Sequence, residues 1–195
     1  MEVLTRAPVP GLAKTRLIPM FGAEGAARIH RALALQTLDL VRRSGLDARL
    51  HLDGALDSAF ADEIRALGFP VVPQVEGDLG ARLIAAMAGP GRRIALGTDC
   101  VRFDPRWLVE AATAEEPVVI GPAEDGGYWT IAVDAPLEAV FCGIPWSTSE
   151  VLERTLAVAH GLGFRVRELP GSYDIDEPVD LMRLMGDPTA PRMSP

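Results

Sequence analysis

The sequence of 195 residues has very little of several residue types. Lys14 is its only lysine, beside 18 arginines, and there is no asparagine. Its two cysteines, Cys100 and Cys142, are too few for a disulfide scaffold, and their spacing matches no zinc-site pattern. No apolar run approaches the roughly 20 residues that span a bilayer, and the first residues lack the apolar core of a signal peptide. We therefore expect a reduced, cytoplasmic protein without a membrane span.

Charge and length narrow the function classes further. The net charge of −8 argues against a nucleic-acid partner, which would call for a basic face. No G-x-S-x-G motif or Cys/His arrangement indicates covalent catalysis. The length suits one well-buried domain and is short for two. We expect a single domain over residues 1–187 and a loose C-terminal tail over residues 188–195.

Short β-branched or apolar runs alternate with helical patterns, which is typical of an α/β fold with a mostly parallel sheet. The runs predict strands at 2–5, 48–53, 69–74, 92–99, 117–121, 128–133 and 164–169. The patterns between them predict helices at 22–44, 56–68, 77–89, from 105 onward, 148–163 and 178–185. Asp104 before Pro105 is expected to cap one helix, and Ser147 with Glu150 to form a capping box for another.

The loop "APVPGLAKTRL", residues 7–17, looks like a phosphate-binding loop with altered residues. A P-loop has Gly before its Lys, whereas Ala13 precedes Lys14 here, and prolines offer no backbone N–H. One explanation of the lone lysine is chance survival in an arginine-rich chain. The other is selection, because a compact point charge meets a phosphate differently from a guanidinium. We favour selection, with Lys14 and Arg16 as phosphate ligands.

Polar clusters follow several of the predicted strands. In open α/β sheets, ligands bind beyond the carboxyl ends of the strands. Four clusters fall there: "PGLAKTR", "QVEGDLGAR", "GTDC" and "YDIDEP". We therefore expect these four segments to meet in one site.

Two of these clusters carry carboxylates suited to Mg²⁺ or Mn²⁺. Asp99 ends a strand while Asp104 supplies the next helix cap, so Asp99 is free to bind a metal; the alternative is a turn aspartate. Asp174 and Asp176 form a D-x-D pair whose side chains share one side of an extended segment. Asp176 is the candidate second metal ligand, with a helix N-cap at Glu177-Pro178 as the alternative.

Other residues are candidates for the acceptor or sugar side. The segment "AEDGGYW" places Glu124 and Asp125 before Gly126 and Gly127, which allow close backbone approach; an acidic hairpin turn is the alternative. Trp146 is a candidate to cover a sugar ring, with core packing as the alternative. The three histidines have no evident partners, and we assign them no catalytic role.

In this order, the motifs resemble a bacterial GT-A-type glycosyltransferase-like family, formerly a domain of unknown function, in the nucleotide-diphospho-sugar transferase superfamily. The resemblance covers residues 7 to about 181 and depends on "PVPGLAKTRL", "GDLGARL", "GTDC", "GPAEDGGYW", "IPWSTSEVLERT" and "DIDEPVDL". It implies a three-layer α/β/α sandwich with a Rossmann-like sheet. It also implies that Asp99 is the metal aspartate, with the "DID" segment on the second metal side.

The same resemblance implies where a nucleotide binds. The first loop would hold its phosphates, and the segment after the third strand would meet its base or ribose. The nucleotide-binding residues expected in this way are Pro10, Gly11, Lys14, Arg16, Gln74, Gly77, Asp78, Gly80 and Thr98. The first loop also resembles the "AK-(S/T)-R-L" segment of 2-phospho-L-lactate guanylyltransferase and, more distantly, that of molybdopterin guanylyltransferase.

Three function hypotheses follow. The first is a metal-dependent glycosyltransferase acting on a nucleotide-diphospho-sugar, with Lys14 and Arg16 holding the departing diphosphate and Asp125 positioning or deprotonating the acceptor. The second is a nucleotidyltransferase, although such enzymes often use a further lysine that this chain lacks. The third is a non-catalytic nucleotide-binding protein. The partner in each case is a nucleotide or nucleotide-sugar; the sugar, base, acceptor and oligomeric state remain open.

Overall fold

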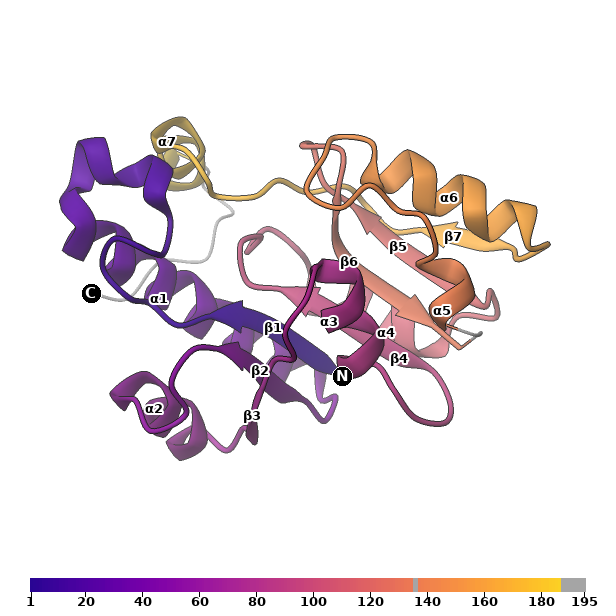
Figure 1. The fold of residues 1–195 in the computed structure, drawn as a ribbon, viewed down its shortest axis with the longest axis horizontal. Helices are drawn as coiled ribbons and strands as arrows, with labels where there is room; N and C mark the ends of the chain where they lie inside the picture. The colour runs from indigo at the N-terminus through magenta and orange to yellow at the C-terminus, as the bar shows by residue number, and fades with distance from the viewer. Residues whose placement is uncertain (135–136, 187–195) are drawn as a thin grey trace.

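The computed structural model describes residues 1–134 and 137–186, so the expected tail at 188–195 lies outside the described residues. Seven strands form one sheet in the order β3-β2-β1-β4-β6-β5-β7 (Figure 1). Their bounds are Glu2–Arg6, Arg49–Asp53, Val71–Pro73, Arg93–Gly97, Val118–Pro122, Tyr128–Val133 and Val166–Glu168 for β1 to β7. Of these described strands, β6 alone runs antiparallel to its neighbours β4 and β5. The mostly parallel sheet is confirmed.

Helices cover both faces of this sheet (Figure 1). The helices are α1 (Ile18–Ser44), α2 (Ala59–Ala66), α3 (Leu79–Ala86), α4 (Pro105–Thr113), α5 (Leu137–Val140), α6 (Val151–Gly161) and α7 (Pro178–Gly186). One core cluster joins buried residues of α1, α2 and α4 to the sheet, and a second joins those of α3 and α6. The expected three-layer α/β/α sandwich is therefore confirmed. Among the described residues no helix is long and apolar enough to cross a membrane.

The first helix is longer than its sequence pattern predicts. The pattern predicts a helix over residues 22–44, and α1 includes them but begins one turn earlier at Ile18. Gly22 has φ 68° and ψ 167°, so the helix is kinked there. Gly45 ends it with φ 74°, as its position predicts, because glycine adopts the left-handed conformation at low cost. The kink separates a short helical segment, residues 18–21, which directly follows the loop around Lys14, from the rest of α1.

The predicted N-cap of α4 is present, whereas the capping box predicted for α6 is wrong. The Asp104 side chain accepts the N–H of Arg106 at the start of α4. Ser147 does not cap α6, which begins at Val151 after an N-cap residue, Glu150, that makes no side-chain cap hydrogen bond. The backbone N–H of Leu152 instead donates to the carbonyl of Gly126 at 2.8 Å, so part of the capping need is met by the β5–β6 turn.

The sheet topology gathers the polar segments at one edge. Parallel strands β1 and β4 end side by side at this edge, which places the Lys14 loop beside Asp99. Because β6 runs the opposite way, the turn between β5 and β6, residues 123–127, reaches the same edge. The segment that precedes α7 arrives there as well, through a hydrogen bond from the N–H of Ile175 to the carbonyl of Asp99 at 2.9 Å.

Candidate active site

A cleft of about 960 Å³ lies at the carboxyl ends of the parallel strands. It is lined by the loop after β1, the ends of β2 and β4, the start of α3, the β5–β6 turn and the segment before α7. The expected site residues in its wall are Lys14, Arg16, Gln74, Gly77, Asp78, Thr98, Asp99, Asp125, Gly127, Trp146 and Asp176. The four polar clusters of the sequence therefore do meet in one place.

Five of the expected residues do not line this cleft: Pro10, Gly11, Gly80, Glu124 and Gly126. Pro10 and Gly11 are exposed, in a turn closed by hydrogen bonds from the N–H groups of Leu12 and Ala13 to the carbonyl of Val9. The turn shapes the first loop, and its later residues face the cleft.

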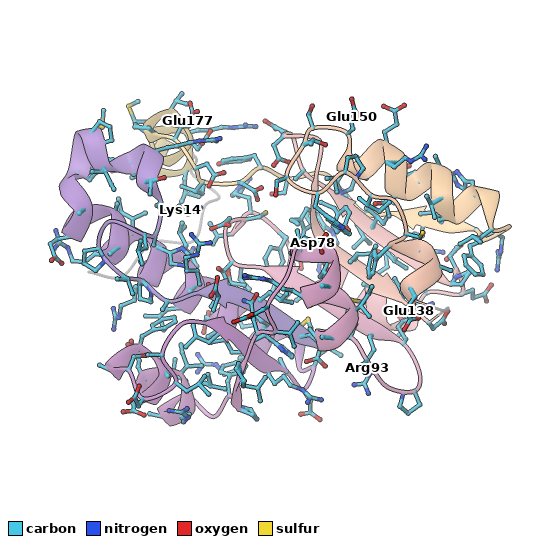
Figure 2. The ribbon with its side chains drawn as sticks, viewed as in Figure 1. Lys14, Asp78, Arg93, Glu138, Glu150 and Glu177 are labelled. Atoms are coloured by element: carbon cyan, nitrogen blue, oxygen red, sulfur yellow. The ribbon has the colours of Figure 1, made fainter. Side chains whose placement is uncertain are left out.

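The backbone of the first loop directs Lys14 inward (Figure 2). Lys14 has φ 48° and ψ 49°, a left-handed conformation that costs a residue with a Cβ roughly 1–2 kcal/mol. A short 3-10 helix, η1 (Thr15–Leu17), follows at once, and the side chain of Leu17 is fully buried. This anchor fixes the loop, and the Lys14 side chain is only 4% exposed.

The Lys14 ammonium lies between two of the predicted metal ligands. Its Nζ is 2.5 Å from Oδ1 of Asp99 and 2.8 Å from Oδ1 of Asp176. Burial alone would lower the pKa of Lys14, but the charges of the two aspartates outweigh it and raise the pKa above its usual value. Lys14 is therefore a fixed cation, and its nearest anions here are protein carboxylates.

Asp176 is free for this contact because another residue caps α7. The carboxylate of Asp180 accepts the backbone N–H groups of Asp176, at 3.1 Å, and of Glu177, at 2.7 Å. The side chain of Asp176 instead faces Lys14, with Nη1 of Arg16 at 4.0 Å. The side chain of Asp99 likewise contacts Lys14, through Oδ1. The helix-cap alternative therefore does not account for the Asp176 carboxylate.

The two carboxylates fit a divalent cation by their geometry. Their Oδ1 atoms converge on one point, which the Lys14 ammonium occupies. Residues 1–134 and 137–186 contain no group of three or more His, Cys, Asp or Glu side chains arranged to hold a metal. Mg²⁺ is often held by one or two carboxylates together with substrate phosphates, so a two-carboxylate site is sufficient for a metal–nucleotide complex.

His30 also faces this point, although no sequence motif indicates a role for it. Its Nε2 lies 2.9 Å from the carbonyl of Arg6, and its Nδ1 lies 3.8 Å from Oδ1 of Asp99. Burial lowers the pKa of His30, which favours the neutral ring with its proton on Nε2. Beneath it, the hydroxyls of Thr5 and Thr98 are 2.7 Å apart. Thr98 therefore supports the floor of the cleft.

On the β2–β3 side of the cleft, a hydrogen-bonded network fixes Gln74. Its Nε2 donates to the carbonyls of Thr5 and His51, and its Oε1 accepts from Arg82 at 3.1 Å. The same Arg82 nitrogen donates to Asp53 at 2.9 Å, and this hydrogen bond is the main reason that the pKa of Asp53 is lowered. Gln74 is thus held in place, with Arg82 and Asp53 beside it.

The start of α3 combines a cap with close packing. Asp78, labelled in Figure 2, accepts the N–H of Ala81 at 2.8 Å and so caps the helix. Gly80 is buried, and a Cβ there would overlap the indole of Trp146. Trp146 packs edge-on against Phe141, and it also lines the cleft. Trp146 therefore both packs against the core and forms part of the cleft wall.

The two acidic residues of the β5–β6 turn, Glu124 and Asp125, differ in the spaces that they line. Glu124 pairs with Arg183 of α7 and lines a smaller cavity of about 250 Å³ next to the cleft. Asp125 lines both spaces, and its Oδ1 accepts the N–H of Gly127 at 2.9 Å. Asp174 also lines both, and burial, with the charges of neighbouring aspartates, raises its pKa to about 7.

Sequence reasoning missed Arg6, His30 and Asp53 of the cleft wall, and it included Arg82 only as part of the "QVEGDLGAR" cluster, without a role of its own. Two of them had a usable signal, since Arg6 and Asp53 are the last residues of parallel strands, where ligand-binding residues gather. His30 and Arg82 belong to helices, and nothing in a helical pattern distinguishes a residue that faces a cleft.

Comparisons with known proteins identify the family of the chain and its fold. A family described as "Uncharacterized protein conserved in bacteria (DUF2064)" matches residues 36–148, more than half of the chain. A search of curated proteins finds no match. The fold is similar to that of a protein from Desulfovibrio desulfuricans G20, described as a candidate nucleotide-diphospho-sugar transferase. The TM-score is 0.84 at 26% identity, over 99% of this chain and 90% of that one.

Two other solved structures share the fold at lower identity. A nucleotidyl transferase from Methanothermobacter thermautotroptrophicus has a TM-score of 0.67 at 18% identity, over 94% of each chain. The inositol-1-phosphate CTP transferase from T. maritima has a TM-score of 0.59 at 16% identity, over 92% of this chain and 90% of that one. The chain therefore belongs to the DUF2064 family, and its fold is that of the nucleotide-diphospho-sugar transferases and nucleotidyltransferases.

Proposed function

We propose that the protein is a metal-dependent transferase that acts on a nucleotide-diphospho-sugar, of the GT-A glycosyltransferase type. The observation that carries the proposal is the convergence of Lys14, Asp99 and Asp176 at the ends of β1 and β4, with Arg16 beside them. Cations and metal-binding carboxylates at one point suit a diphosphate. The likeness to the Desulfovibrio protein, over almost the whole chain, supports the same substrate class.

The charge of the cleft supports metal dependence. Six aspartates line it, at positions 53, 78, 99, 125, 174 and 176, against four cations, at positions 6, 14, 16 and 82. A nucleoside diphosphate would therefore approach a wall with more negative than positive groups. A divalent cation at Asp99 and Asp176 would cancel that excess of negative charge where the phosphates bind. When bound, such a metal would neutralise charge on the departing nucleoside diphosphate.

The residues of the chain then have separate roles. Lys14 and Arg16 bind the diphosphate oxygens and hold the charge that develops as the glycosidic bond to the diphosphate breaks. Gln74, Gly77 and Asp78 face the base or ribose from the β3–α3 side. Trp146, which packs against Gly80 at the start of α3, covers the sugar or its acceptor.

Asp125 is positioned to act on the acceptor. Its Oδ1 is held by the N–H of Gly127, which leaves Oδ2 to accept the proton of an acceptor hydroxyl. The bond that forms joins that oxygen to the anomeric carbon, and the bond that breaks joins the anomeric carbon to the diphosphate. The proton of the hydroxyl passes to Asp125, and the electron pair leaves with the diphosphate.

A nucleotidyltransferase is the second candidate, and one observation favours it. Arg6, at the end of β1, lines the cleft beside the first loop, and its side chain is 57% exposed. Arg6, Lys14 and Arg16 together would give a triphosphate more cationic contacts than a diphosphate requires. In that reaction an acceptor phosphate attacks the α-phosphate, and pyrophosphate leaves.

The identity of the leaving group separates the candidates. We would incubate the protein with Mn²⁺ and a mixture of UDP-sugars and GDP-sugars, and expect slow release of UDP or GDP even with water as acceptor. A parallel incubation with nucleoside triphosphates and sugar phosphates should yield no pyrophosphate. Asp125→Asn should bind nucleotide as the parent does but release less diphosphate. Pyrophosphate without diphosphate would establish the second candidate; tight nucleotide binding without either product would indicate a non-catalytic nucleotide-binding protein.

A further inference from the structure

One point in the cleft is shared by a lysine of the chain and the expected metal. The carboxylate oxygens of Asp99 and Asp176 converge there, at 2.5 and 2.8 Å from Nζ of Lys14. An ammonium and a divalent cation cannot occupy the same point together. A metal bound through these same two oxygens, Oδ1 of Asp99 and Oδ1 of Asp176, therefore has to displace Lys14.

The two sides of this point differ in access. The Lys14 side chain is 4% exposed and reaches the carboxylates from the protein side, on a loop anchored by Leu17. The side chains of Asp99 and Asp176 are 48% and 43% exposed, so a second cation can reach them from the cleft. A free metal ion arriving there would meet carboxylates whose charge Lys14 already compensates in part. It would also leave a buried ammonium without an anionic partner.

A metal–nucleotide complex would meet a different situation. Its phosphates would arrive with the metal and accept the ammonium as it leaves the carboxylates. Displacement then exchanges one set of anionic oxygens for another, and no buried charge is left unpaired. The binding of metal and nucleotide is coupled as a result, each increasing the affinity for the other by the same factor.

We propose that Lys14 is the specificity residue that makes this site accept a metal–nucleotide complex in preference to a free metal ion. The preference for a metal–nucleotide complex rests on the proposed function. The weak binding of a free metal ion does not depend on it. It also explains why one lysine is retained beside 18 arginines. An ammonium is a compact point charge that can stand where a metal ion stands, whereas a planar guanidinium cannot.

The single lysine permits a direct observation in the unmodified protein. Labelling with lysine enriched in ¹³C at Cε gives one NMR signal, that of Lys14. We expect Mg²⁺ alone to leave this signal in place, and Mg²⁺ with GDP or UDP to shift it. A signal that moves with Mg²⁺ alone, at the concentration that suffices with nucleotide, would overturn the proposal. So would binding of Mg²⁺–GDP or Mg²⁺–UDP, detected by calorimetry, with the signal unmoved.

A second experiment measures the metal without nucleotide. Titration of Mn²⁺, followed by the EPR signal of the free ion, should show that Lys14→Met binds Mn²⁺ about tenfold or more tightly than the parent. The control is Arg183→Met, which removes a cation that pairs with Glu124 rather than with the two aspartates. Its Mn²⁺ affinity should change less than about threefold. Equal affinities in the parent and Lys14→Met would overturn the proposal.

The two experiments also distinguish this proposal from the proposed function. If neither GDP nor UDP binds with Mg²⁺, the proposed function fails, and with it the nucleotide half of the inference. The Mn²⁺ comparison then still decides whether Lys14 excludes a free metal ion. The NMR titration requires no variant, so the proposal remains falsifiable if Lys14→Met does not fold.

Discussion

Lys14 and Asp176 are 162 positions apart in the sequence, yet Nζ of the lysine lies 2.8 Å from Oδ1 of the aspartate. The contact joins the loop after β1 to the segment before α7, and it crosses the carboxyl end of β4, where Asp99 completes the group. This part of the cleft is therefore assembled from three distant stretches of chain. Its polar side chains contact one another closely.

Removing the Lys14 charge should affect ligand binding much more than folding. We expect Lys14→Met to weaken binding of Mn²⁺–GDP or Mn²⁺–UDP by about 1.5–3 kcal/mol, the range for a lost charged hydrogen bond. The melting temperature should fall by a few degrees only, because Asp99 and Asp176 are about half exposed and water solvates them. Calorimetry and thermal unfolding provide the two measurements. Unfolding of the variant, or parental affinity for both nucleotides, would refute the phosphate role.

Asp99 should be necessary for the effect of metal. Asp99→Asn keeps the shape of the side chain but loses the charge that attracts a divalent cation. Thermal-shift measurements with GDP or UDP, with and without Mn²⁺, should show metal-dependent stabilisation in the parent and little in the variant. For scale, a ligand that binds only the folded state at 100 times its Kd adds about 2.7 kcal/mol. If Asn at this position leaves the Mn²⁺-dependent shift intact, Asp99 is not a metal ligand.

Asp174 should make the stability of the ligand-free protein depend on pH. Its pKa is raised to about 7 in the folded state, from a usual value near 3.8, so folding favours the protonated carboxyl. The stabilisation is complete below about pH 4 and is lost as pH rises through about 7. Asp174→Asn should therefore reduce the fall in unfolding free energy between pH 5 and pH 8 by about 2 kcal/mol. Urea denaturation at both pH values measures this change. The same fall in unfolding free energy between pH 5 and pH 8 in parent and variant would contradict it.

The β5–β6 turn should depend on Gly126. This residue has φ 87°, and a Cβ there would overlap the carbonyl group of Ser149, whose loop leads into α6. Gly126→Ala should destabilise the protein by about 2 kcal/mol or more, through left-handed strain and this overlap. Gly161→Ala is a matched control inside α6, where a Cβ meets nothing within 4 Å, and it should be neutral or stabilising. Similar melting temperatures for the two variants would contradict this account.

Local patterns predicted the secondary structure well. Short apolar runs identify strands because helices cover both faces of the sheet, so side chains on both faces of strands such as β5 and β6 are buried. Glycines such as Gly45 mark helix ends through their conformational freedom. The failure at Ser147 has a tertiary cause. That residue has φ 64°, and the carbonyl of Gly126 accepts an N–H from the first turn of α6. A capping motif in the sequence does not reveal such a distant acceptor.

The members of the site were more predictable than their partners. Lys14, Asp99 and Asp125 could be placed in one cleft because each follows a strand or precedes the reversed one at the same sheet edge. The pairing of Lys14 with Asp99 and Asp176 could not be predicted from the sequence, because the lysine and the two aspartates could equally well each bind a different group of a ligand. The position of Glu124 was equally hidden, because its partner Arg183 comes from a helix whose packing the sequence does not specify.

The contact between β1's loop and the segment before α7 bears on how the protein is made. Domains fold as the chain emerges during translation, N-terminal parts first. The sheet can begin to form from β1, β2 and β3 early, but the Lys14 ammonium has no Asp176 to meet until that late segment has left the ribosome. A nascent chain can therefore be largely folded while its cleft is still incomplete. Nucleotide affinity should thus be acquired abruptly, near the end of synthesis, rather than growing with chain length.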